Sequence, residues 1–124
     1  MSITLLSNDG QSFQVSREVI RQLGAIDGFF KSMGFDNEPD DRIEPIPLPT
    51  INGYILEMII DFLNHHINDP DDQPITQWDI DFLPTDDEDT LRRLYDESVN
   101  LKVEKLSRIC AIFLVRFARH PVEV

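Results

Sequence analysis

The sequence has 124 residues, a formal net charge of −12 at pH 7 and 41% hydrophobic residues, including eight phenylalanines. This length suits one domain, and this hydrophobic content excludes a disordered chain. The acidic balance disfavours nucleic acid and anionic membranes, because both bind clusters of lysine and arginine and the 11 basic residues are scattered along the sequence. We therefore expect no nucleic-acid or membrane partner, whereas basic protein surfaces remain suitable partners.

The cysteine content and the apolar segments indicate the compartment. Cys110 has no second cysteine with which to pair, which excludes a disulfide scaffold. The N-terminus lacks the features of a signal peptide, and no segment approaches the ~18 apolar residues of a membrane helix. We expect a protein of the cytoplasm or the nucleus.

The N-terminal residues predict a β-hairpin followed by two short helices. Residues 3–6 and 13–15 are β-prone, and Asp9-Gly10 lies between them, where glycine accepts the positive φ of a tight turn. Ser16 is a natural N-cap for the next segment.

The first helix is predicted over 17–23, and we expect Gly24 to end it. A second short helix is predicted over 25–33. The segment 35–44 is acidic and contains Pro39, which predicts a solvated loop.

A proline-bounded strand and a strongly apolar helix follow in the middle of the chain. Residues 43–48 have the sequence Ile-Glu-Pro-Ile-Pro-Leu, and we expect them at a sheet edge because proline cannot donate a ladder hydrogen bond. The helix over 54–67, capped by Thr50 or Asn52, is apolar around most of its circumference. Such a helix is packed on several sides, so we expect it to be the central one.

The C-terminal half predicts three further helices. A polar loop over 68–77 leads to a short helix over 78–83, which Pro84 ends. The acidic run 86–89 precedes the next helix, where carboxylates favour the free N–H groups. The last helix, over 103–119, has a broad apolar face.

No residue pattern indicates catalysis or a metal site. Adjacent residues on a helix point about 100° apart, so His65 and His66 cannot share an ion, and we interpret them as a surface pair at a helix end. The acidic loops lack the glycine and glutamate of a calcium-binding loop. Cys110 falls on an apolar helix face, where a buried thiol is inert. We predict a protein that is not an enzyme and uses no cofactor or metal.

Four segments stand in a distinctive order: ITLLSNDGQSFQV over 3–15, PIPLPTIN over 45–52, HHINDP over 65–70 and WDIDFL over 78–83. Together they resemble the S-phase kinase-associated protein (Skp) family, the BTB/POZ-fold adaptors of SCF ubiquitin ligases. The resemblance implies an α/β (α+β) fold with a small mixed sheet flanked by helices. It implies one BTB/POZ domain over 1–119 and a short tail over 120–124.

The resemblance also implies the partners. The family binds a cullin scaffold through its BTB portion and an F-box protein through its C-terminal helices, so this chain would link the two. Members typically continue with a Gly-Lys-Thr-Pro-Glu-Glu turn and two further helices that clasp the F-box. This sequence ends at Val124, so we expect the fold to lack those two helices.

The turn that faces the cullin commonly has the sequence Ala-Ala-Asn-Tyr-Leu-Asp-Ile in the family. Residues 97–103 correspond to it: Leu101 matches, Val103 is a like-for-like change, and Val99 and Asn100 differ. Without the clasp, we expect the apolar face of the last helix to be partly uncovered and to seek a partner. The predicted partner-binding residues are Leu101, Val103, Leu106, Ile109, Phe113 and Phe117.

Two alternatives remain open. Uncovered apolar faces also suit a self-assembling BTB module or an elongin C-like subunit, which would form homodimers. The other alternative is a truncated paralogue that folds but no longer assembles a ligase.

Overall fold

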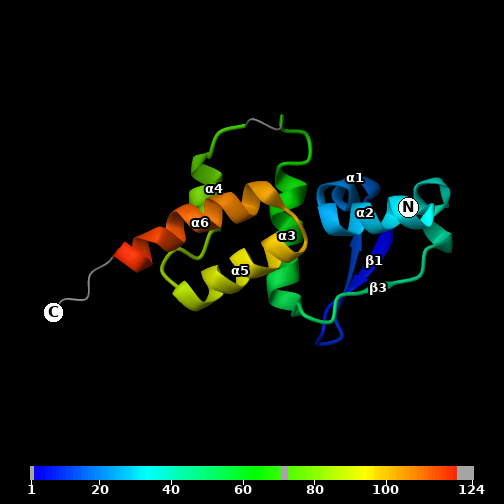
Figure 1. Ribbon diagram of the computed structural model, residues 1–124, viewed down its shortest axis with the longest axis horizontal. Helices are drawn as coiled ribbons and strands as arrows, with labels where there is room; N and C mark the ends of the chain where they lie inside the picture. The colour runs from blue at the N-terminus through cyan, green and yellow to red at the C-terminus, as the bar shows by residue number, and fades with distance from the viewer. Residues whose placement is uncertain (1, 71–72, 120–124) are drawn as a thin grey trace.

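The computed structural model describes residues 2–70 and 73–119, and the predicted tail over 120–124 lies outside them. The sheet and the helices α1 and α2 form one end of the molecule, α4, α5 and α6 form the other, and α3 lies between them (Figure 1). The elements are β1 (Ile3–Leu6), β2 (Ser12–Val15), α1 (Arg17–Gln22), α2 (Gly24–Met33), β3 (Ile46–Pro47), α3 (Gly53–His65), α4 (Gln77–Phe82), α5 (Glu88–Asn100) and α6 (Glu104–Arg119).

The sheet is small and mixed, in the order β2-β1-β3. Strands β1 and β2 pair antiparallel, as the predicted hairpin requires, and β1 and β3 pair parallel with Leu5 opposite Ile46. Strand β3 is therefore an edge strand, which confirms the prediction from its prolines, although it is shorter than predicted. The N–H of Leu48 continues the pairing by donating to the carbonyl oxygen of Leu6 at 2.8 Å.

The hairpin turn is hydrogen-bonded to the start of α3. Gly10 has a φ of 85°, as predicted for this turn. Asp9 accepts a hydrogen bond from the N–H of Gly53 at 3.0 Å. Hydrogen bonds from the side chains of Ser7 and Gln11 and from Gly53 lower the pKa of Asp9. Asn52, one of the two predicted caps, accepts from the N–H of Ile55 at 2.9 Å and begins α3.

The structure corrects the role predicted for Gly24. The chain bends at Leu23, with φ −91° and ψ 85°, and Gly24 is the first residue of α2 rather than a left-handed helix end. Gly24 is glycine for a packing reason, because a Cβ there would lie 2.9 Å from the Cβ of Lys102. The left-handed glycine of this region is Gly34, with φ 76°, which ends α2.

The acidic segment over 35–44 is more ordered than a solvated loop. It contains two 3-10 turns, Phe35–Asn37 and Asp40–Arg42. The guanidinium of Arg17 donates from Nε to the Asp40 carboxylate at 2.6 Å and from Nη1 to the carbonyl oxygen of Phe35 at 3.0 Å. Arg17 therefore folds this acidic segment back onto α1, a contact between positions too far apart in the sequence to be predicted from local patterns.

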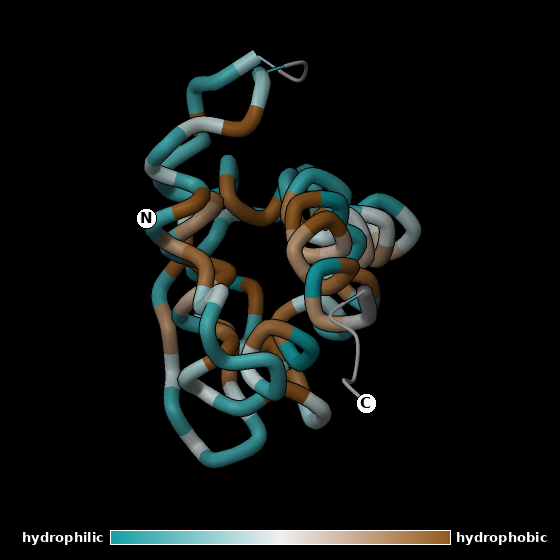
Figure 2. Tube along the Cα trace, turned by 90° about the vertical axis from the view of Figure 1, so that its left-hand side faces the viewer, coloured by the Kyte–Doolittle hydropathy of each residue, from teal (hydrophilic) through white to brown (hydrophobic). Residues whose placement is uncertain are grey.

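Helix α3 is central, as predicted. It contacts α1, α5 and β2, and most of its apolar side chains are buried. Burying such a side chain contributes roughly 1.5–3 kcal/mol, so this helix carries much of the core. Hydrophilic stretches lie in loops at the periphery, including the loop at the top of Figure 2. The buried residues of α3 are Gly53, Ile55, Leu56, Ile59, Ile60, Phe62 and Leu63.

Candidate partner-binding surfaces

The structure places the predicted partner-binding residues mainly inside the molecule. Helices α5 and α6 form an antiparallel pair (Figure 1), and the apolar face of α6 joins Leu91 and Leu94 of α5 in one hydrophobic cluster. The expectation that this face is partly uncovered is therefore wrong for most of it. The buried residues are Leu101, Val103, Leu106, Ile109 and Phe113, and Phe117 is half-buried and packs against the same cluster.

A different stripe of α6 faces solvent. Ile112 and Val115 are 53% and 46% exposed. Beside them, Ile75 is also exposed, and a cleft of about 380 Å³ lies between residues 73–75 and α6. We call the cleft with Ile112 and Val115 the α6 groove. Helix α6 has apolar residues on two sides, one with Leu106, Ile109 and Phe113 and the other with Ile112 and Val115. The sequence pattern alone does not show which of the two sides packs against α5.

A second apolar cleft lies between α2 and β3, and we call it the α2–β3 groove. Its volume is about 530 Å³. Phe29 stands at its border and is 50% exposed, in edge-to-face contact with Phe35 at a centroid distance of 5.8 Å. The apolar lining residues include Phe29, Phe35, Ile43, Ile46, Leu48 and Leu101.

The turn that the resemblance assigns to the cullin lies beside this groove. The N–H of Ala25 donates to the carbonyl oxygen of Leu101 at 3.0 Å and holds the turn against the start of α2. Leu101 lines the groove but is only 7% exposed, whereas Val99 is 47% exposed on α5. The groove itself was missed by sequence reasoning, because it arises from segments that lie far apart in the chain.

The two histidines occupy different environments. His65 is exposed and stacks on Trp78 with a centroid distance of 3.6 Å, but the side chain of His66 is only 7% exposed. Both ring nitrogens of His66 contact carboxylates, Nδ1 with Asp69 and Nε2 with Asp79, each at 2.5 Å. The interpretation as a surface pair is therefore wrong for His66, which ties the end of α3 to α4.

Asp79 is a fully buried carboxylate whose role is structural. It forms a capping box with Thr76 at the start of α4 and also contacts His66. Burial acts to raise the pKa of Asp79, but the Thr76 N–H and the His66 ring together hold that pKa below its ordinary value. The charged form is therefore the one that the fold stabilises.

The remaining candidates for chemistry are the cysteine and the possible metal-binding clusters. Cys110 is buried, as predicted, and burial raises the pKa of its thiol to about 12. Across residues 2–70 and 73–119, no three His, Cys, Asp or Glu side chains are placed to hold a metal ion. None of the helices in the same ranges combines the length and the hydrophobicity needed to cross a bilayer.

Comparison with known proteins identifies the family. Residues 1–68, from the hairpin to the end of α3, match the family described as "Skp1 family, tetramerisation domain". The chain belongs to the Skp1 family. The three-stranded mixed sheet with its helices is the POZ fold of that family, and Skp1 family adaptors are not enzymes.

Relatives in the Skp1 family include animal and plant proteins. A "Skp1-related protein" of Caenorhabditis elegans is 34% identical over 97 residues, which cover 68% of this chain and 54% of the relative. In Arabidopsis thaliana, "SKP1-like protein 14" is 27% identical over 88% of this chain and 68% of the relative, and "SKP1-like protein 9" is 36% identical over 68% and 54%. The chain therefore spans about half the length of two of these Skp1 relatives.

Proposed function

We propose that this protein is an adaptor of a cullin–RING (SCF) ubiquitin ligase in the cytoplasm or the nucleus, where it links an F-box protein to a cullin. An adaptor needs two docking surfaces that can be occupied together. The observation that carries the proposal is the presence of two separate apolar surfaces on a member of the Skp1 family, namely the α2–β3 groove and the α6 groove.

The α2–β3 groove is the proposed cullin site. It lies on the POZ portion of the chain, and it combines an apolar lining with an exposed aromatic side chain, Phe29. Buried aromatic anchors are the residue type that most often dominates binding energy at protein interfaces. Val99 and Asn100 are exposed in the last turn of α5, so they would form the border of this contact.

The α6 groove is the proposed F-box site. Ile112, Val115 and Ile75 give an F-box helix an apolar strip, while the buried residues Leu106, Ile109 and Phe113 support that strip from below. An amphipathic helix that lays its apolar face into such a groove is a common mode of recognition. Leu106, Ile109 and Phe113, which the sequence predicted as partner contacts, are thus proposed to affect F-box binding indirectly, because their packing sets the position of α6.

The test is the assembly of a ternary complex. The purified chain, shown to be folded by circular dichroism, is mixed with a cullin N-terminal domain, with an F-box segment, and with both. Size-exclusion chromatography with light scattering is expected to give a 1:1:1 complex in the last mixture. A folded chain that binds neither protein would contradict the proposal.

Self-assembly is the second candidate function. The description of the matching family names a tetramerisation domain, and an apolar groove can also accept a second copy of the chain. Light scattering over a concentration series separates the two functions. A mass that rises towards a multiple of 14.4 kDa and a loss of cullin binding at high concentration would favour self-assembly through the α2–β3 groove.

A further inference from the structure

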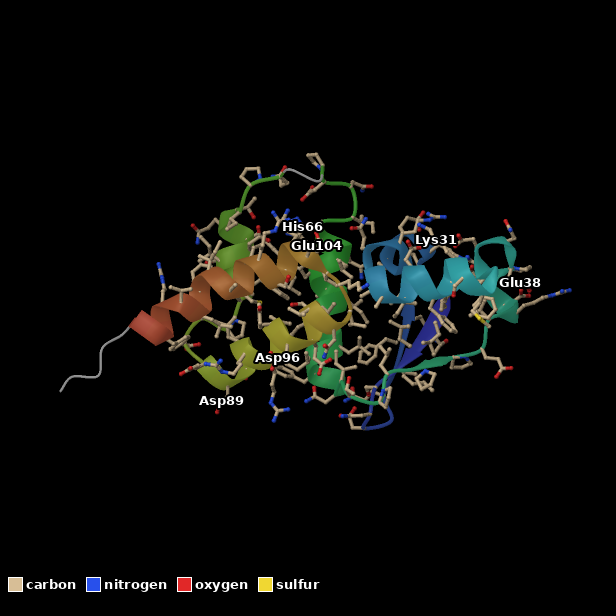
Figure 3. The ribbon with its side chains drawn as sticks, viewed as in Figure 1. Lys31, Glu38, His66, Asp89, Asp96 and Glu104 are labelled. Atoms are coloured by element: carbon tan, nitrogen blue, oxygen red, sulfur yellow. The ribbon has the colours of Figure 1, made fainter. Side chains whose placement is uncertain are left out.

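Basic side chains that are scattered in the sequence converge on one cleft of the fold. Arg21, Lys102, Lys105 and Arg108, four of the chain's 11 basic residues, line a cleft of about 360 Å³. The cleft lies where α3 ends and α6 begins, and in Figure 3 its residues His66 and Glu104 lie close together at this junction. We call it the basic cleft.

The amine of Lys105 is buried without a partner. Its Nζ is shut off from solvent and has no hydrogen-bond partner among residues 2–70 and 73–119, although the residue as a whole is only partly buried. Lysine normally does the opposite and keeps its charged end in water while its hydrocarbon stem is covered. A buried, unpaired ammonium is costly, so this arrangement indicates that an anion belongs beside it.

The acidic residues of the cleft do not supply that anion. Asp69 is held by His66 at 2.5 Å, and Glu104 is exposed at the start of α6. Among the described residues that line the cleft, four basic side chains therefore exceed two carboxylates, in a protein whose total charge is −12. Such a local reversal of charge focuses a positive field on the cleft.

The start of α6 strengthens this field. Val103 occupies the cap position, where its carbonyl accepts from the N–H of Ser107 at 3.0 Å, and its hydrocarbon side chain cannot accept from the first N–H groups of the helix. Glu104 and Lys105, in that first turn, line the cleft. The N-terminal end of a 16-residue helix favours an anion at this position.

We propose that the basic cleft binds a phosphate group between Arg21, Lys102 and Arg108, and that the amine of Lys105, which is covered in the unbound protein, turns towards the phosphate and pairs with it. A phosphate dianion fits better than a single carboxylate, because four basic side chains line one cleft and guanidinium groups match the geometry of phosphate oxygens. Lys105 and Arg108 also line the α6 groove, so the basic cleft and the proposed F-box site share these two side chains. Binding of inorganic phosphate requires no F-box protein and therefore tests the cleft separately from the ligase function.

The first experiment measures the binding of inorganic phosphate by amide NMR titration of the full chain. We expect saturable shifts confined to residues near 21, 66 and 102–108, and roughly tenfold weaker binding for Lys105→Met, which removes the charge and keeps the length of the side chain. Arg93→Met is the matched control, because it removes one positive charge from the exposed face of α5 outside the cleft. Shifts that do not saturate, or equal weakening by the two variants, would overturn the proposal.

The second experiment follows thermal unfolding. Without phosphate, Lys105→Met should melt at a higher temperature than the wild-type chain, because it removes an unpaired buried charge. Added phosphate should raise the Tm of the wild-type chain and of Arg93→Met by mass action, and that of Lys105→Met much less. An equal rise in all three proteins would show a general salt effect and sink the proposal.

The source of the phosphate group is distinguished by comparing ligands. A short phosphoserine peptide is titrated beside inorganic phosphate, with the unphosphorylated peptide as control. Tighter binding of the phosphopeptide would assign the group to a modified protein, and equal or weaker binding would assign it to a free anion. Binding of the unphosphorylated peptide with the same affinity would contradict a phosphate site.

Discussion

Gly24 lies directly against Lys102, such that a Cβ atom on Gly24 would lie 2.9 Å from the Cβ of Lys102 and 3.0 Å from its carbonyl oxygen. Next to this contact, the N–H of Ala25 donates to the carbonyl oxygen of Leu101. Lys102 itself has a φ of 59°, a conformation that few residues other than glycine adopt. The first turn of α2 and the α5–α6 turn are thus joined by backbone contacts, and the α2–β3 groove and the basic cleft each include residues from both.

Replacing Gly24 by alanine should therefore destabilise the protein. The added methyl group meets a Cβ and a backbone oxygen that cannot rotate away, and overpacking of this kind costs about 1–3 kcal/mol. Urea unfolding followed by circular dichroism measures the change.

Gly28→Ala is the matched control in the same helix. A Cβ at Gly28 meets nothing within 4 Å, so the variant should gain up to ~1 kcal/mol from helix propensity. A Gly24→Ala variant as stable as Gly28→Ala would show that the junction with Lys102 is not tight.

Asp79 should make the free energy of unfolding decrease at acidic pH. Its pKa is lowered in the folded state, so its contribution is complete above the unfolded value of about 3.9 and is lost as the pH falls through the lower folded value. Asp79→Asn should cost roughly 1–3 kcal/mol at neutral pH, since it removes the charge that faces Thr76 and His66.

Denaturant unfolding at a series of pH values tests this prediction. The difference between the wild-type chain and Asp79→Asn should shrink as the pH falls below about 4. Asp81→Asn, which changes an exposed carboxylate on the same helix, is expected to change stability by less than about 0.5 kcal/mol at neutral pH. A constant difference between wild type and Asp79→Asn down to acid would refute the assignment.

Local signals were sufficient to predict most of the fold. Asp9-Gly10 indicated the hairpin, the prolines of 45–49 indicated an edge strand, and the pair of candidate caps Thr50 and Asn52 indicated the start of the central helix, which Asn52 caps. Each of these predictions depends on the backbone preferences of a few adjacent residues, which the sequence displays directly.

The candidate surfaces could not be predicted in the same way. Whether Phe113 or Ile112 faces solvent depends on which side of α6 is covered by α5, and a helix that is apolar on two sides carries no sign of this. The burial of His66 and the convergence of Arg21 with Lys105 likewise arise from packing between segments that are distant in the sequence.

Helix α6 has a buried face that includes Leu106 and an exposed face that includes Ile112, and substitutions on the two faces should have different effects. Leu106→Ala removes a fully buried side chain and should cost about 2–5 kcal/mol of stability. Ile112→Ser changes an exposed side chain and should alter stability by about 0.5 kcal/mol or less, yet it should weaken F-box binding by roughly tenfold or more.

Unfolding curves and biolayer interferometry with an immobilised F-box segment measure the two effects. Binding is compared at a temperature where both variants are folded. If Ile112→Ser bound the F-box segment as tightly as the wild-type chain, the outer stripe of α6 would not be the contact, and the α6 groove would lose its proposed role.

Phe29 provides the corresponding test of the α2–β3 groove. Phe29→Ser removes a half-exposed aromatic ring; it should lose the edge contact with Phe35, worth about 0.5–1.5 kcal/mol, together with the contribution of the buried half of the ring. If the ring anchors the cullin, the same change should cost about 2 kcal/mol or more of binding free energy, or roughly thirtyfold in Kd. Tyr54→Ser is the control, because Tyr54 is 60% exposed and lines neither groove. Calorimetric titration with a cullin N-terminal domain should therefore show a loss for Phe29→Ser and none for Tyr54→Ser, and equal affinities for the two variants would place the cullin elsewhere on the molecule.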